Sequence, residues 1–226
     1  MAFDDLAARV AEVRERVAAA AVRGGHRQQV TIVAVTKTYG PEAVHAAWAA
    51  GVRDVGENRV QEATGKMEQV DVPVRWHLIG HLQRNKVRAL DGFALFHAVD
   101  SPRLADALCA RGIERGHPVE ALVQVNSSGE GSKGGYGADE LLAEAERLTT
   151  LSGLLVRGVM TMAPLTSDEA VLRATFAGAR DARRLLAEAG LPAAELSMGM
   201  SNDYELAVEE GATMVRLGTA LFGARS

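Results

Sequence analysis

A lysine stands at the end of the first apolar run of the chain. Residues 30–36 are mostly β-branched and have the length of a buried strand, and they lead directly into Lys37 and Thr38. Lysine is almost never fully buried unless it is paired, so Lys37 either reaches solvent at the strand's end or is held in a pocket for chemistry. In a pocket, a lysine that has lost its proton can attack a carbonyl carbon, because its amine is then a nucleophile.

A second group of candidate residues lies near the other end of the chain. Arg216 stands inside an apolar run, and Gly218 and Thr219 follow it as a turn. Shortly before that run, the segment 197–203 carries Met200 and Ser201. Backbone N–H groups can bind a phosphate dianion, and glycine lets the anion approach them closely. The alternative is that Ser201 only caps a helix and Gly218 only makes a turn.

Two further patterns could indicate a binding site. The glycine-rich segment 128–137 contains Lys133 but lacks the Gly-Lys-Ser/Thr spacing of a Walker phosphate loop. We interpret it as a loop over the mouth of the fold, with Lys133 as a second-site or lid residue that is either solvated or directed at an anion. His77 and His81 are four residues apart without the glutamate of a zinc protease between them, so we predict no metal site.

Eight short apolar runs are expected to position these residues as strands. A helical pattern or a helix-like turn follows each run, and the connections are short, which favours a parallel sheet with crossover helices. Strands are predicted at 30–38, 52–55, 74–79, 93–99, 119–125, 154–162, 195–198 and 213–217. Helices are predicted at 41–50, 59–69, 102–115, 138–150, 167–189 and 203–210, with a loop and helix over 80–91. An amphipathic helix over 3–23 precedes the first strand.

This alternation predicts the fold class α/β, a single (β/α)8 TIM-type barrel domain over residues 1–226 with an extra N-terminal helix. The alternative, an open doubly wound sheet, usually carries a glycine-rich dinucleotide motif after its first strand, and residues 36–40 do not match one. A barrel places its site at the carboxyl ends of its strands, and the last two loops often bind phosphate. The predicted binding residues are Lys37, Asn58, His77, Met200, Ser201, Arg216, Gly218 and Thr219.

Composition excludes several classes of function. The net charge is −4 with both signs interspersed, which predicts no nucleic-acid partner and no membrane partner. Cys109 is the only cysteine, so no intrachain disulfide can form and a reducing compartment fits. No apolar run approaches eighteen residues, and the first residues lack the pattern of a signal peptide. We therefore expect a cytoplasmic protein.

An inward lysine, an opposing arginine and a phosphate-binding turn together describe a site for pyridoxal 5′-phosphate (PLP). Six motifs make this interpretation specific: 34–38 (AVTKT), 56–62 (GENRVQE), 77–86 (HLIGHLQRNK), 132–135 (SKGG), 196–201 (LSMGMS) and 215–219 (VRLGT). In this order, along nearly the whole chain, they resemble the pyridoxal phosphate homeostasis protein family. The resemblance implies a barrel similar to the N-terminal domain of alanine racemase. It also implies that Lys37 forms an imine with the cofactor, that Arg216 faces the pyridine nitrogen, and that Ser201, Gly218 and Thr219 hold the phosphate.

The function implied by the resemblance is a non-enzymatic carrier of PLP in intracellular homeostasis. Its expected partners are PLP itself and, transiently, PLP-dependent apoenzymes, and a monomer is expected. The alternative is an amino-acid racemase, which needs bases on both faces of the cofactor. The resembled racemase takes one base from a tyrosine in an additional domain that this chain is expected to lack, although Tyr39 or Tyr136 could supply it. An arginine at the ring nitrogen also weakens the electron sink, so we predict a carrier without catalytic residues.

Overall fold

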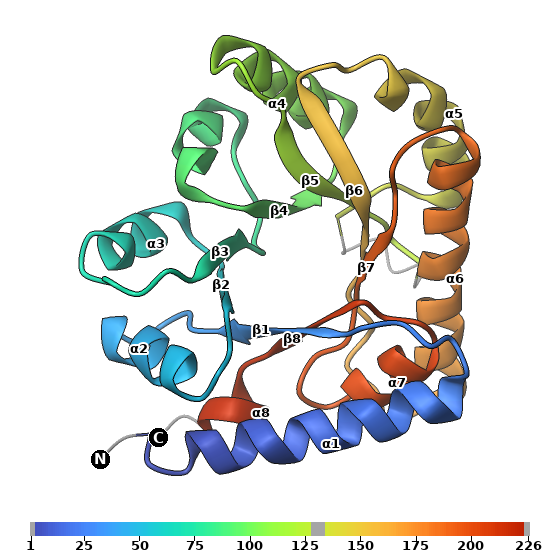
Figure 1. Ribbon diagram of the computed structural model, residues 1–226. Helices are drawn as coiled ribbons and strands as arrows, with labels where there is room; N and C mark the ends of the chain where they lie inside the picture. Colours follow the sequence, from blue (N-terminus) through green and yellow to red (C-terminus); the bar gives the residue numbers. More distant parts are fainter. Residues whose placement is uncertain (1–2, 128–133, 224–226) are drawn as a thin grey trace.

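The eight strands pair in parallel and in chain order until the last pairs with the first, which closes a barrel (Figure 1). The computed structural model describes residues 3–127 and 134–223. The strands are β1 (Thr31–Val35), β2 (Asp54–Glu57), β3 (Arg75–Leu78), β4 (Leu95–Val99), β5 (Val119–Gln124), β6 (Leu154–Met160), β7 (Glu195–Ser197) and β8 (Met214–Leu217). The predicted (β/α)8 TIM-type barrel is confirmed.

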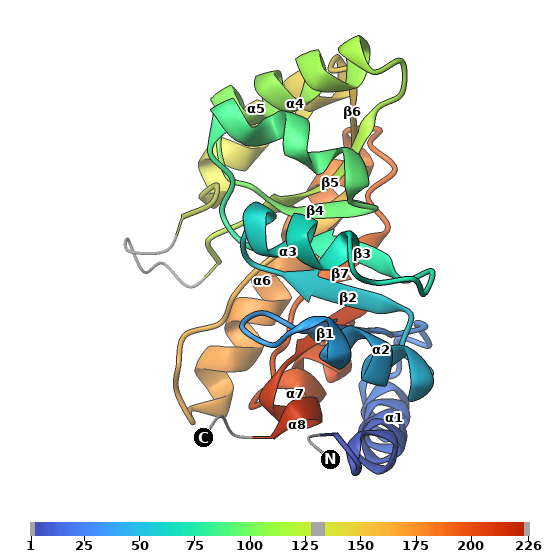
Figure 2. The ribbon, with the colours of Figure 1, turned by 90° about the vertical axis from the view of Figure 1, so that its left-hand side faces the viewer.

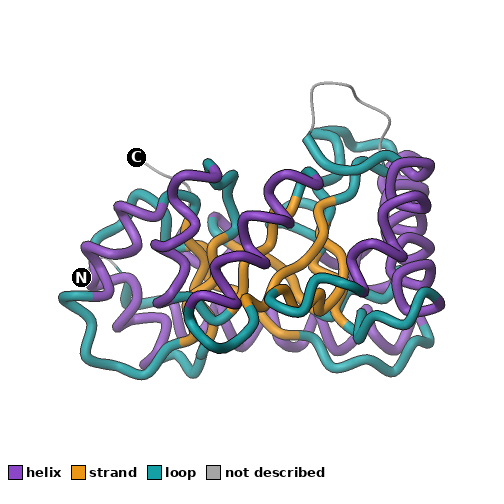
Figure 3. The backbone as a smooth tube through the Cα atoms, turned by 90° about the horizontal axis from the view of Figure 1, so that it is seen from above, coloured by secondary structure: helices purple, strands orange, loops and turns teal. Residues whose placement is uncertain are grey.

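Helices surround the strands, which lie in the middle of the molecule (Figure 3). The helices that follow the strands are α2 (Pro41–Ala49), α3 (Val60–Met67), the 3-10 helix η1 (Arg84–Gly92), α4 (Pro102–Glu114), α5 (Ala138–Thr149), α6 (Glu169–Glu188), α7 (Tyr204–Glu209) and α8 (Thr219–Phe222). Parallel strands that are covered on both faces have continuous apolar sequences, and for this reason the strands could be predicted from the apolar runs.

The N-terminal helix α1 (Leu6–Gly24) is an addition to the eight-fold pattern, as predicted. It packs on α7, α8 and α2, outside the barrel. Figures 1 and 2 show it with α7 and α8 on one side of the barrel, opposite α4 and α5. The residues that gave its sequence an amphipathic period, Leu6, Val10, Val13 and Val17, are all buried.

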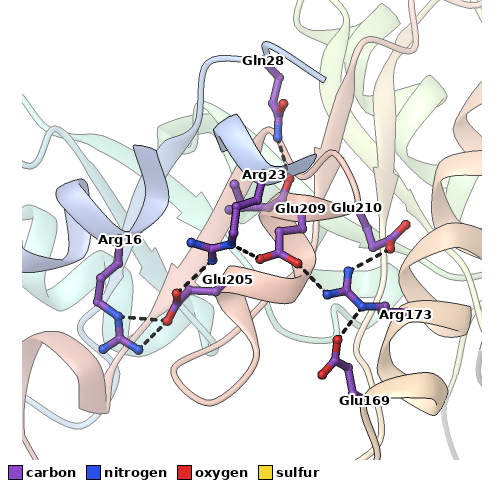
Figure 4. A network of polar contacts seen from close by, with 9 residues as sticks. Arg16, Arg23, Gln28, Glu169, Arg173, Glu205, Glu209 and Glu210 are labelled. Atoms are coloured by element: carbon purple, nitrogen blue, oxygen red, sulfur yellow. Dashed lines mark hydrogen bonds and ion pairs between the residues drawn. The ribbon is translucent and has the colours of Figure 1, made fainter. Parts of the chain in front are cut away.

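Ion pairs join α7 to the two helices beside it (Figure 4). Arg16 and Arg23 of α1 bind Glu205, and Arg23 Nε lies 2.6 Å from Glu209 Oε1. The other oxygen of Glu209 lies 2.6 Å from Arg173 of α6. The arginines of these pairs are one-third or more exposed, and pairs at a protein surface contribute about 0–1 kcal/mol each, so their effect is mainly positional. They fix α7, whose preceding loop reaches the candidate site.

Some helices and strands begin or end at residues other than those predicted from the sequence. The second strand lies at Asp54–Glu57 rather than 52–55, because the Val52 N–H donates to Ala47 O at 2.9 Å and Val52 so belongs to the turn that follows α2. The predicted helix in 80–91 is a 3-10 helix. After β8, where a turn at Gly218 and Thr219 was predicted, the chain forms the short helix α8. The two ends of the barrel meet as expected, since Val33 of β1 pairs with Arg216 of β8.

Candidate functional site

A cavity of about 890 Å³ opens at the carboxyl ends of the barrel strands. This volume is in the range of sites for small molecules and cofactors. Seven of the eight predicted binding residues line it: Lys37, Asn58, Met200, Ser201, Arg216, Gly218 and Thr219. They come from the segments after β1, β2, β7 and β8 and from β8 itself, so the barrel brings together residues from both ends of the sequence.

The backbone before Lys37 is held by a buried cluster. Lys66 of α3 donates from Nζ to Thr36 O at 2.8 Å and to Glu57 Oε1 at 2.7 Å. Thr36 Oγ1 donates to the same carboxylate oxygen at 2.5 Å. Burial raises the pKa of Glu57, although the hydrogen bonds from Lys66 and Thr36 act in the opposite direction. The end of β1 is therefore fixed by an ion pair that water barely reaches.

The backbone after Lys37 is held by the same cluster. Lys66 Nζ also lies 2.9 Å from Glu62 Oε1, and that oxygen accepts a hydrogen bond from the Thr38 N–H. Thr38 has a φ of 71°, which is strained for a β-branched residue. Such a conformation persists only where neighbouring contacts enforce it. Both peptide groups that flank Lys37 are thus positioned, which orients its side chain on the cavity wall.

Arg216 presents a buried positive charge to the cavity. Only 5% of the residue is exposed, and its terminal nitrogens donate to Ser197 Oγ at 2.6 Å and to Thr161 O at 2.8 Å. Burial lowers the pKa of Arg216 to about 10, with Asp203 acting in the opposite direction, so the guanidinium remains charged at neutral pH. Two of its five donors are used in these contacts.

The loops after β7 and β8 meet on the cavity wall. The Ala220 N–H donates to Ser201 Oγ at 3.0 Å, which joins the β7 loop to the turn at Gly218 and Thr219. Ser201 can still donate its own hydroxyl proton, because this contact uses the oxygen as an acceptor. The two hydroxyls and the backbone near Gly218 form a concave set of polar groups suited to an anion.

Glycine at position 199 makes the β7 loop possible. Gly199 has a φ of 94°, and a Cβ there would lie 2.7 Å from Ala207 Cβ of α7. Its carbonyl accepts the Arg216 N–H at 3.0 Å. The next residue, Met200, donates its N–H to Asp203 Oδ1 at 2.6 Å. Burial raises the pKa of Asp203, although the Met200 contact and the charge of Arg216 act in the opposite direction.

His77 does not line the cavity, although the sequence placed it among the binding residues. It lies within β3, and its ring is buried between Asp54 and His97 in the barrel interior. The cavity wall is formed by residues beyond the strand's end, including His81, whose Nδ1 lies 2.9 Å from Asp100 Oδ2. Lys133 lies outside the described residues, so its predicted role stays a prediction.

None of the three tyrosines lines the cavity. Tyr39 packs against the rings of Phe3 and Phe222. Tyr136 donates its hydroxyl to Glu144 Oε1 at 3.3 Å, and burial, with Glu144 acting in the same direction, raises its pKa. Tyr204 is buried in α7. The two phenols considered as bases from the sequence are therefore engaged elsewhere.

Sequence reasoning missed a set of polar residues inside the barrel. Asp54, His97 and Ser197 are buried; His77 links Asp54 to His97 by hydrogen bonds, and His97 bonds Ser197 directly. The only signal in the sequence was an acid or imidazole within a short apolar strand. Among the described residues, no group of three His, Cys, Asp or Glu side chains could hold a metal ion. No helix within 3–127 and 134–223 has the length and apolar character needed to cross a membrane.

Known proteins resemble this chain over nearly its full length. The family described as alanine racemase, N-terminal domain, matches residues 6–226. The pyridoxal phosphate homeostasis protein of Pseudomonas aeruginosa is 43% identical, over 97% of this chain and 96% of that protein. The protein of the same name from Escherichia coli strain K12 is 38% identical, over 99% of this chain and 98% of that protein.

Solved structures also resemble this chain. PipY of Synechococcus elongatus PCC7942 without PLP is 40% identical, with a TM-score of 0.86 over 96% of this chain and 100% of that chain. A structure of PipY with PLP bound has 39% identity and a TM-score of 0.85 over the same shares. Alanine racemase from Corynebacterium glutamicum is 19% identical, with a TM-score of 0.75 over 98% of this chain and 61% of the racemase, a likeness of fold alone. The chain therefore belongs to the alanine racemase N-terminal domain family and, within it, to the pyridoxal phosphate homeostasis proteins.

Proposed function

We propose that this chain binds PLP through Lys37 and serves as a non-enzymatic carrier of the cofactor in intracellular PLP homeostasis. The observation that carries the proposal is that Lys37 and Arg216, from opposite ends of the sequence, line one cavity beside Ser201 and Thr219. The names of the relatives and the PLP-bound structure of PipY support it. Residues 1–226 would then act as one PLP-binding domain.

The side chains of the cavity fit the chemistry of PLP. When bound, the cofactor supplies an aldehyde that condenses with an amine, and a phosphate that needs hydrogen-bond donors. Lys37 would offer the amine, while Ser201, Thr219 and the backbone near Gly218 would hold the phosphate. Arg216 would keep a positive charge at the ring nitrogen, where a proton would otherwise sit. Asn58 and Met200 complete the wall.

We also propose that the chain meets other proteins transiently and acts in the cytoplasm. Met162, Leu165 and Met200 are exposed at the rim of the cavity, where a transient partner such as a PLP-dependent apoenzyme could contact the loaded protein. Cys109 is a free thiol, which is compatible with the reducing cytoplasm. The chain would act as a monomer. Analytical ultracentrifugation of the PLP-loaded protein tests that state, and a sedimentation coefficient of a dimer at micromolar concentration would contradict it.

Amino-acid racemisation is the competing function, since the barrel has the racemase fold. Proton transfer by a positioned side chain contributes typically about 10²–10⁴-fold, and racemisation needs such a group on each face of the cofactor. No tyrosine lines the cavity, and Arg216 disfavours a protonated ring nitrogen. The residues of this cavity therefore support binding of PLP better than they support racemase chemistry.

Incubation of the loaded protein with L-alanine in D₂O should show exchange at the α-carbon far below about 1 s⁻¹, the lower end of ordinary kcat values. NMR of the recovered alanine measures both deuterium incorporation and the D-enantiomer. Tyr39→Phe and Tyr136→Phe serve as controls and should give the same slow rate. Turnover at or above that rate, lost in either variant, would replace the carrier by an enzyme.

A further inference from the structure

A row of buried polar side chains crosses the interior of the barrel and ends at Arg216. His77 Nε2 lies 2.9 Å from Asp54 Oδ1, and His77 Nδ1 lies 2.9 Å from His97 Nε2. His97 Nδ1 lies 3.0 Å from Ser197 Oγ, which accepts from Arg216 at 2.6 Å. Each residue of the row is less than a tenth exposed. Holding PLP at the cavity wall does not by itself require this arrangement, so it needs its own explanation.

The direction of the hydrogen bonds can be worked out from the Arg216 end. A guanidinium only donates, so Ser197 Oγ accepts from Arg216 and its own proton is free to point at His97 Nδ1. Burial holds the pKa of His97 well below its usual value, with the neighbouring His77 and Arg216 acting in the same direction. His97 is therefore neutral, and since its Nδ1 accepts from Ser197, its single proton sits on Nε2.

The remaining bonds follow from this assignment. The His97 Nε2–H donates to His77 Nδ1, so the proton of His77 is on Nε2 and points at Asp54 Oδ1. Asp54 also accepts from Arg75 at 2.7 Å. Although burial alone would raise the pKa of Asp54, the hydrogen bonds from His77 and Arg75 lower it, so the carboxylate is ionised. Every donor along the row then points from Arg216 toward Asp54.

The opposite direction is less favourable. It would protonate both nitrogens of His77 and place the His97 proton on Nδ1, where it would point at an oxygen that already accepts from Arg216. The Ser197 hydroxyl proton would then lose its acceptor within the row, and a buried donor without a partner is costly. A second cation would also enter an interior that already holds Arg216.

We propose that Asp54, His77, His97 and Ser197 are positioning residues that orient the Arg216 guanidinium toward the cavity, with both histidines held as neutral Nε2–H tautomers. Ser197 fixes one terminal nitrogen of Arg216, and the histidines and Asp54 fix the direction of the Ser197 hydroxyl. Thr161 O fixes the other terminal nitrogen. The role of Arg216 toward PLP rests on the proposed function, whereas the tautomers do not.

Nitrogen-15 NMR of the PLP-free full-length protein tests the tautomers directly. The chain has six histidines, and loss of a signal set in His97→Gln, and separately in His77→Gln, assigns the two rings. At neutral pH, we expect Nδ1 of both rings at the shift of an unprotonated nitrogen and Nε2 at that of a protonated one. Two protonated nitrogens on His77, or an Nδ1–H on His97, would overturn the proposal.

Substitution of Ser197 tests the link to Arg216. Ser197→Ala should weaken PLP binding about tenfold and shift the His97 Nδ1 resonance, because both neighbours lose their partner. Ser197→Thr keeps a hydroxyl and should restore the resonance and most of the affinity. Arg216→Ala gives the loss of PLP affinity when the guanidinium is absent, and the loss in Ser197→Ala is compared with it. As a matched control, Thr175→Val removes a buried hydroxyl in α6 that, within the described part of the chain, donates to Val171 O of its own helix, and it should change neither quantity.

The two proposals fail in different ways. If the unmodified protein has no measurable affinity for PLP, the proposed function is wrong, while the tautomer measurement still judges the row. If PLP binds but Ser197→Ala changes its dissociation constant by less than twofold, the positioning role is wrong and the proposed function stands. If Ser197→Thr changes the His97 Nδ1 resonance and weakens PLP binding as much as Ser197→Ala does, the hydroxyl does not act as proposed.

Discussion

Replacing Lys37 by alanine should abolish the borohydride-reducible link between this chain and PLP and weaken retention of the cofactor by at least about tenfold. Among the described residues, Lys37 is the only lysine on the cavity wall. Lys66 is paired with Glu57 in the interior, and Lys86 belongs to η1 and lines a surface groove that α3 also borders. No other described amine can replace Lys37 without a rearrangement of the fold. Visible absorbance of the gel-filtered protein before and after reduction measures the effect.

The matched control for this prediction is Lys86→Ala, which removes a lysine of the same length from outside the cavity. It should retain the cofactor and its absorbance like the unmodified protein. Circular dichroism melting of both variants separates loss of the amine from loss of the fold. If Lys37→Ala kept a reducible adduct in full yield, another lysine would be the attachment site.

Lys66→Met should lower the free energy of unfolding by about 3–5 kcal/mol, the cost typical of removing one partner of a buried ion pair. Lys66 and Glu57 are 5% and 0% exposed, so the carboxylate left behind would be desolvated and without its cation. The peptide groups that flank Lys37 would also lose Lys66 and, through Glu62, part of their support. Since domains are stable by only about 5–15 kcal/mol, urea denaturation should show a large shift of the midpoint.

The pH dependence and a second substitution identify the cause. Without Lys66, burial raises the pKa of Glu57 further above its unfolded value, so stability is lost as the pH rises through that pKa. The deficit of Lys66→Met should therefore be smaller at about pH 5 than at about pH 8. Adding Glu57→Gln removes the stranded charge and should recover a large part of the loss. Lys86→Met is the control, and a change below about 0.5 kcal/mol in both lysine variants would contradict the account.

The sequence predicted correctly the location of residues whose environment depends only on whether they lie within a strand or just after it. Apolar runs with crossover helices predicted the barrel, and a barrel places the residues after its strands at one opening. That reasoning selected Lys37, Asn58, Ser201 and Thr219, which line one cavity. It needed no knowledge of register, because residues beyond any strand's end reach the same opening.

The interior of the barrel could not be predicted in the same way. Whether His77 faces the cavity or the space beneath it depends on the strand pairing, and a shift of one residue reverses the direction of a side chain. The partners of His77 are Asp54, 23 residues before it, and His97, 20 residues after it. Lys66 looks like a solvated residue of an amphipathic helix until the structure shows that Glu57, inside a strand, needs a cation.

The most direct test of the account is to identify the lysine that carries PLP. The chain has only four lysines, at positions 37, 66, 86 and 133, so borohydride reduction of the loaded protein, proteolysis and mass spectrometry can assign the adduct without ambiguity. We expect the added mass on the peptide that contains Lys37, with at most trace amounts elsewhere. An adduct found mainly on the peptide of Lys133, or of either of the other two lysines, would contradict it.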